Sequence, residues 1–165
     1  MYEDPIINAY IDLIKANTSA IKAFYQGEPI RIPAVNLPCA IISKRETRVG
    51  PFSNAEDEHA IGMSITVITD VRKELSTDEN IAEVVAGVAS LYDIMEGRNA
   101  DLTLKAESLL AILRHNIAPD LAHGLRTDLQ TVTRVDYGTT LRDRDRGEYS
   151  IEARVDFVAS IHQVR

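Results

Sequence analysis

The residue types that could catalyse a reaction or hold a metal are few in this sequence and lie far apart. The four histidines do not stand at metal-ligand spacing from one another or from the single cysteine; they are His59, His115, His123 and His162. We interpret them as ordinary surface or half-buried side chains. The sequence also lacks a glycine-rich phosphate loop, a nucleophile elbow and a His-Glu-x-x-His helix. No catalytic, cofactor or metal site is therefore predicted, and we expect that the protein is not an enzyme.

Three other reactive side chains have simple structural interpretations. Cys39 lies within an apolar run, residues 37–41, where we expect a small core residue and not a nucleophile. A single cysteine cannot form a disulfide within the chain, which fits a reducing compartment. Asp93 and Glu96 lie one turn apart on a predicted helix, and we interpret them as part of a solvated face and not as an acid/base pair.

Polar and aromatic groups in two predicted hairpin loops, residues 49–57 and 138–147, point instead to partner contacts. The first loop carries Phe52, which either folds back onto its own sheet or serves as an interaction element. The second carries arginine and aspartate in alternation, which either form ion pairs across an interface or lie at a solvated loop tip. The candidate interface residues are Arg48, Phe52, Arg142, Arg144 and Arg146.

Length and charge restrict the class of protein. The 165 residues are enough for one domain, residues 1–165, with its own core. The N-terminus does not read as a signal peptide, and no apolar run approaches the length of a membrane span, so we expect a protein made in a cytoplasm without a membrane partner. The net charge of −7 argues against wrapping nucleic acid.

A long alternating stretch, residues 148–164, organises the predicted fold. Its apolar residues occur at every second position and predict a strand with one buried face; they are Tyr149, Ile151, Ala153, Val155, Phe157, Ala159 and Ile161. Upstream, Asp4 and Pro5 predict the start of a helix that runs to about Tyr25. Residues 39–48 and 58–67 predict a hairpin of two strands.

Further elements follow in the second half of the chain. Residues 76–79 form a capping box that opens a helix ending at Gly97, and a second helix is expected over residues 103–115, with Asp101 as its cap. Residues 131–137 predict the third strand. The order predicts an α+β fold with a four-stranded, mainly antiparallel sheet of two hairpins and two to three helices packed on one face.

This order of elements resembles the tail terminator, or tail completion, proteins of long-tailed bacteriophages. The resemblance rests on the long N-terminal helix, the proline-rich crossing at residues 30–38, the charged hairpin loop and the final strand that ends in residues 157–165. It covers nearly the whole chain. The sequence departs from the pattern by an extra helix and an irregular segment between residues 100 and 126.

The resemblance implies a structural virion protein, located in the tail or neck, that closes into a six-membered ring on the head-proximal end of the tail tube. Such a ring stops tube growth and offers the surface to which the head connector or another neck protein docks. DNA would pass through its lumen without specific binding, and an acidic wall suits that passage. The alternatives are another phage neck protein, such as a head-completion or connector-adaptor protein, or a small cytoplasmic ligand-binding α+β domain.

Overall fold

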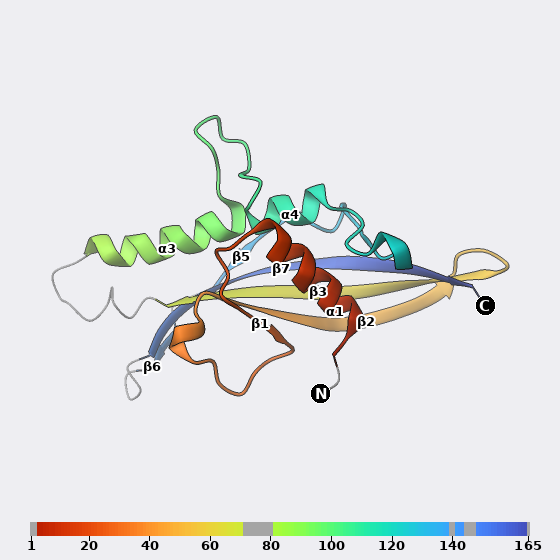
Figure 1. Cartoon of the computed structure of the whole chain (residues 1–165), viewed down its shortest axis with the longest axis horizontal. Coiled ribbons are helices and arrows are strands. Elements are labelled where there is room, and N and C mark those ends of the chain that lie inside the picture. Colours follow the sequence, from red (N-terminus) through yellow and green to blue (C-terminus); the bar gives the residue numbers. More distant parts are fainter. Residues whose placement is uncertain (1–2, 71–80, 139–140, 144–147, 165) are drawn as a thin grey trace.

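A computed structural model of the chain describes residues 3–70, 81–138, 141–143 and 148–164. It confirms the α+β class: within these described ranges, three α-helices accompany one mixed sheet (Figure 1). The helices are α1 (Pro5–Asn17), α3 (Ile81–Glu96) and α4 (Leu109–His115), and short 3₁₀ turns are η1 (Ala34–Asn36) and η2 (Leu121–His123). The strands are β1 (Ala23–Gln26), β2 (Cys39–Pro51), β3 (Glu56–Asp70), β4 (Arg126–Thr127), β5 (Asp136–Tyr137), β6 (Leu141–Asp143) and β7 (Glu148–Val164).

The predicted terminal strand is confirmed as β7, the longest strand of the described chain. Its alternate side chains are buried as expected, from Ile151 through Ala153, Val155 and Phe157 to Ala159. β3 pairs antiparallel with β7 along its entire length, from Glu56 opposite Val164 to Asp70 opposite Ser150. The period of two in the sequence therefore corresponds to one buried and one more open face.

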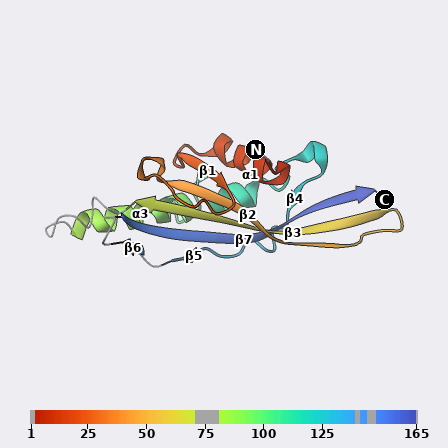
Figure 2. The same ribbon diagram turned by 90° about the horizontal axis from the view of Figure 1, so that it is seen from below.

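The helices cover the buried face of the sheet (Figure 2). Apolar side chains of β2, β3 and β7 on this face meet those of α1, α3 and α4 in one core. Tyr10 of α1 is fully buried there, against Phe157. Leu91 and Met95 of α3 and Leu109 and Leu113 of α4 complete the helical side.

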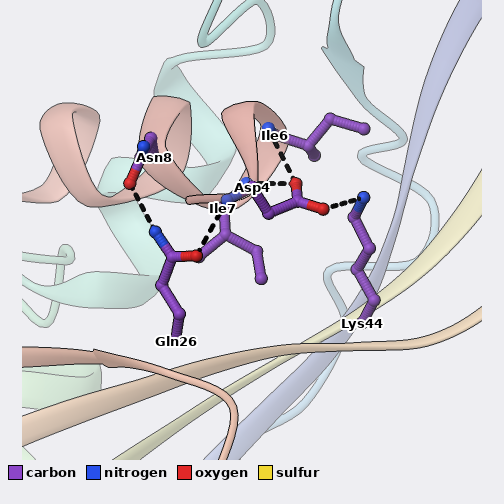
Figure 3. Close-up of polar contacts among 6 residues, drawn as sticks. All are labelled: Asp4, Ile6, Ile7, Asn8, Gln26 and Lys44. Carbon is purple, nitrogen blue, oxygen red and sulfur yellow. Dashed lines mark hydrogen bonds and ion pairs between the residues drawn. The ribbon is translucent and has the colours of Figure 1, made fainter. Parts of the chain in front are cut away.

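A polar network fixes the start of α1, as the Asp4-Pro5 pair predicts (Figure 3). The Asp4 carboxylate accepts hydrogen bonds from the amides of Ile6 (2.9 Å) and Ile7 (3.2 Å), and its second oxygen contacts the Lys44 ammonium of β2 at 2.5 Å. Gln26 of β1 accepts from the amide of Asp4 at 3.0 Å. The helix cap thus joins two strands to α1.

The predicted extent of α1 is wrong, because the helix ends at Asn17 and not near Tyr25. Thr18 is the C-cap, and its hydroxyl accepts from the amide of Ala20, which favours a turn over another helical turn. Phe24 and Tyr25 instead form β1, which pairs parallel with residues 39–42 of β2.

The expected four-stranded sheet of two hairpins is only partly right: the first hairpin is confirmed as β2 and β3, but the sheet contains further strands and one parallel pair. The sheet order is β1-β2-β3-β7-β4, and the β1–β2 pair is parallel. β5 and β6 also pair with β7, on the side away from β3. β7 is therefore flanked by partners over most of its length and is not a simple edge strand. The short strands were missed because two or three residues give no period that a sequence can reveal.

The first hairpin loop is shorter than expected. The predicted loop over residues 49–57 contains only four unpaired residues, 52–55, because β2 and β3 stay paired as far as Pro51 opposite Asp57. A β-bulge between Lys44 and Glu46 interrupts the register. The two strands therefore extend further from the core than their polar sequence suggests.

The middle of the chain departs from prediction at α4 and at the third predicted strand. α3 ends next to Gly97 as expected, whereas the predicted capping box at residues 76–79 lies outside the described residues. α4 begins at Leu109 and not near Thr103, and Asp101 accepts hydrogen bonds from Thr103 in a turn instead of capping a helix. The predicted strand 131–137 shrinks to β5, because residues 128–132 form turns that bury Val132 in the core.

Candidate functional site

The structure keeps the candidate chemical groups apart. Cys39 is fully buried at the start of β2, and burial raises the pKa of its thiol to about 11, as befits a core residue. Asp93 binds the Lys105 ammonium at 2.6 Å, and Glu96 lies 3.8 Å from the Arg98 guanidinium. These two carboxylates therefore each have a basic partner, which fits the interpretation of a solvated face.

The four histidines occupy four different elements: β3, the end of α4, η2 and β7. His123 contacts the Asp120 carboxylate at 2.7 Å, and His162 lies 3.8 Å from Glu58. In the part of the chain that is described, no three histidine, cysteine, aspartate or glutamate side chains gather as metal ligands would. Nor is any helix there long and apolar enough to cross a membrane.

Open clefts lie at the sheet margins. One of about 520 Å³ lies at the end of α3, where the rings of Tyr92 and Tyr137 meet edge-on at 4.7 Å. Burial, assisted by the Glu96 carboxylate, raises the pKa of Tyr137, so this phenol stays protonated and is not a base at neutral pH. Another of about 620 Å³ lies between α1 and β1, lined by Glu3, Asp12 and Lys15 among others.

The most distinctive surface is a three-stranded extension of the sheet, which we call the arm. It consists of residues 48–51 of β2, 56–60 of β3 and 160–164 of β7. Residues 52–55 join β2 to β3 at its tip. Figures 1 and 2 show the sheet running past the helices at this end. The register places Arg48, Ala60 and Ser160 side by side at its base.

Apolar side chains of the arm are open to solvent. Val49 is 59% exposed, Phe52 57% and Val164 71%. The Phe52 ring also lies 4.0 Å from the His162 ring, so Phe52 folds back onto β7 and still presents more than half of its surface. These exposed side chains make the arm the candidate contact surface.

The structure brings together two of the five predicted interface residues. Arg48 and Phe52 both lie on the arm, and Arg48 contacts the Glu46 carboxylate at 3.1 Å with most of its side chain exposed. Arg142 lies in β6, opposite Tyr149 at the start of β7, and so in a strand and not in the predicted loop. Arg144 and Arg146 lie outside the described residues.

The two predicted contact regions lie at opposite ends of the sheet. β6 pairs with the first residues of β7, whereas the arm contains the last ones. At about 3.3 Å per residue, Tyr149 and His162 are about 40 Å apart along the strand. A single small partner would therefore not touch both regions.

Sequence reasoning missed the arm as a surface. The polar residues of β2 beyond Ser43 gave no clear alternation, and their pairing with β3 is a property of the register. The extended alternation of β7 to Ile161 was the one signal that the sheet continues beyond an ordinary strand length. No known protein family matches this chain, and its sequence matches no curated protein.

Proposed function

We propose that this chain is a structural virion protein of the tail terminator type. In this role six copies form a ring at the head-proximal end of a phage tail tube, end tube growth and provide the surface for head joining. The observation that supports the proposal best is the arm, which extends past the helices and presents Val49, Phe52 and Val164 to solvent. Such a projection suits contact with neighbouring subunits.

The net charge supports a ring on a DNA conduit. The chain has a net charge of −7, so a ring of several copies would have an acidic wall that repels DNA passing through its lumen. The partners in this role are further copies of the chain, the tail tube protein and a connector or neck protein. The protein would be made in the host cytoplasm and reside in the virion tail or neck.

The opposite placement of the arm and of β6 supports a subunit with two contact regions. A ring component must hold its neighbours and also bind a tube below or a connector above. Arg142 lies about 40 Å along β7 from His162. One end of the sheet can therefore contact neighbouring subunits while the other end binds the tube or the connector.

Native mass spectrometry tests the proposal in solution. We expect a monomer or weak associate at low concentration and a closed ring of six when the concentration rises or tail tubes are added. A stable dimer under all conditions, with no larger ring on tails, would contradict the proposal.

A further inference from the structure

The arm has an unpaired strand edge on each of its two sides. On the β2 side, β1 pairs only with residues 39–42, and no described residue pairs with that side of β2 beyond Ile42. On the β7 side, β4 ends its pairing at Ser160, and within the described ranges nothing pairs with that side of residues 161–164. Unpaired edges of this kind accept a further strand.

The two edges run in the same direction. β2 and β7 are both antiparallel to β3, so both run from the helical body to the tip of the arm. If the β2 edge of one copy meets the β7 edge of the next, and both copies turn the same face of the sheet to the same side, the two strands are parallel. Each copy then uses two different surfaces. Such a heterologous contact gives a ring where the rotation between copies closes and an open filament where it does not, whereas a two-fold dimer would pair like with like.

We propose that residues 49–51 of β2 pair with residues 161–163 of β7 from a second copy of this chain. This inference rests on the proposed ring and specifies its subunit contact. The register places Val49, His59 and Ile161 level on one face of the arm. With neighbouring strands about 4.8 Å apart, Val49 of one copy then lies beside Ile161 of the next, and its exposed side chain is covered.

The opposite face also accommodates this pairing. Gly50 lies level with Glu58 and His162, so the new neighbour of Gly50 would be the His162 imidazole of the next copy. No atom lies within 4 Å of where a Cβ of Gly50 would be, which leaves room for that ring. A larger side chain at position 50 would crowd the contact.

Features of β2 limit the contact to a short stretch. The bulge between Lys44 and Glu46 disturbs the edge on the body side, and Pro51 has no N–H to donate on the tip side. On the β7 side, β4 already pairs with Ser160, so only residues 49–51 of β2 lie level with the open stretch, and a single contact is weak. In a closed ring every copy makes two such contacts, so the ring is held more strongly than any pair. The proposed contact therefore fits the expected monomer in dilute solution and the expected ring on the tail.

Cysteine cross-linking tests the contact directly. In a Cys39→Ala background, Val49→Cys and Ile161→Cys are introduced together, and rings on tail tubes are oxidised and run on a denaturing gel. Within one chain these positions are separated by β3, about 9.6 Å, which exceeds the roughly 7 Å that a disulfide permits. Every cross-link therefore joins two copies. Thermal melts compare each variant with the Cys39→Ala parent to confirm folding.

We expect a ladder of linked chains from the double variant and only dimers from a mixture of the two single variants. The matched control, Val49→Cys with Ser160→Cys on the opposite face, should give far less product.

Rings visible by electron microscopy without cross-links between Val49→Cys and either Ile161→Cys or Gln163→Cys would overturn the edge contact and leave the ring proposal standing. Cross-linked dimers of the Val49→Cys single variant would indicate that β2 of one copy pairs with β2 of another. This result would also overturn the proposed β2–β7 contact. Cross-linked open filaments without rings would support the contact and contradict the terminator function.

Discussion

The rings of Tyr10 and Phe157 meet edge-on, with centroids 5.0 Å apart and planes inclined by 62°. Tyr10 comes from α1 and Phe157 from β7, so this contact joins the first helix of the chain to its last strand. The Tyr10 hydroxyl also bonds the Thr127 hydroxyl of β4 at 2.8 Å, inside the core. One side chain thus connects helix, central strand and a short flanking strand.

Phe157→Ala should therefore destabilise the fold strongly. The side chain is 3% exposed, and truncating a buried phenylalanine costs about 3–5 kcal/mol of unfolding free energy. Glu152→Ala, on the more open face of the same strand, is the matched control and should cost little. Thermal and urea melts measure both, and equal, mild effects would show that the facing assigned to β7 is wrong.

Tyr10→Phe should remove one buried hydrogen bond and leave the Thr127 hydroxyl without its partner. The cost is about 1–3 kcal/mol in urea unfolding at neutral pH. Thr127→Val in the same background is the control, because removing both partners should recover part of that loss. If the single change costs nothing, the hydroxyl pair does not stabilise the core.

The pH dependence of stability gives a second test of Tyr10. Burial raises the pKa of Tyr10 from 10.0 to about 12, despite the hydrogen bond with Thr127. Between these values the unfolded chain loses the proton first, so stability falls as pH rises, by up to about 1.4 kcal/mol per pH unit. Tyr10→Phe should have a flatter stability curve over this window. Parallel curves for the two proteins would argue that Tyr10 is not buried.

Asp4→Ala should weaken the start of α1 by about 0.5–2 kcal/mol, because it removes the cap and the contact with Lys44. Burial alone would raise the pKa of Asp4, but the Lys44 and amide hydrogen bonds outweigh it and lower the pKa below 3.8. The stabilisation is therefore present above pH 3.8 and is lost as pH falls through the lower folded value. Asp4→Asn, which keeps a capping oxygen, should cost less than Asp4→Ala in denaturant melts at neutral pH. Equal costs would assign the effect to Lys44 alone.

Much of this fold could be read from periodicity and capping signals, and the errors have local causes. The alternation of β7 and the Asp4-Pro5 start of α1 were strong patterns, and both are confirmed. Apolar residues up to Tyr25 at helical spacing predicted a helix, but residues 23–26 form the strand β1. This strand forms because it pairs with β2, and the sequence around Tyr25 does not reveal that pairing. Val132 looked like part of a strand but is buried through a turn.

The candidate surface was only partly predictable, for a related reason. Phe52 was recognised as a group that a simple turn does not need, and the structure places it on the arm beside His162. The length of the arm depends on the β2–β3 register, which continues through residues without a hydrophobic pattern. A strand edge can be identified only once the pairing of all neighbouring strands is known. The two open edges of the arm therefore could not be predicted from the sequence.

The arginine run at the other end of the sheet remains a prediction. Replacing Arg142, Arg144 and Arg146 together should leave the melting temperature near that of the wild type and weaken binding to the ring or the tail. A variant that loses only one of these charges should be more sensitive to salt, because added ions screen the remaining attraction. A triple variant that caps tails and supports head joining at wild-type levels would show that these arginines form a solvated tip.

Negative-stain electron microscopy of the purified protein with tail tubes is the most direct test of the terminator function. The tubes come from particles assembled without this protein, and their lengths and ends are compared before and after its addition. We predict a six-fold ring on one end of each tube and tubes that no longer elongate when tube protein is supplied. Bare tube ends and continued elongation at saturating protein would contradict the account.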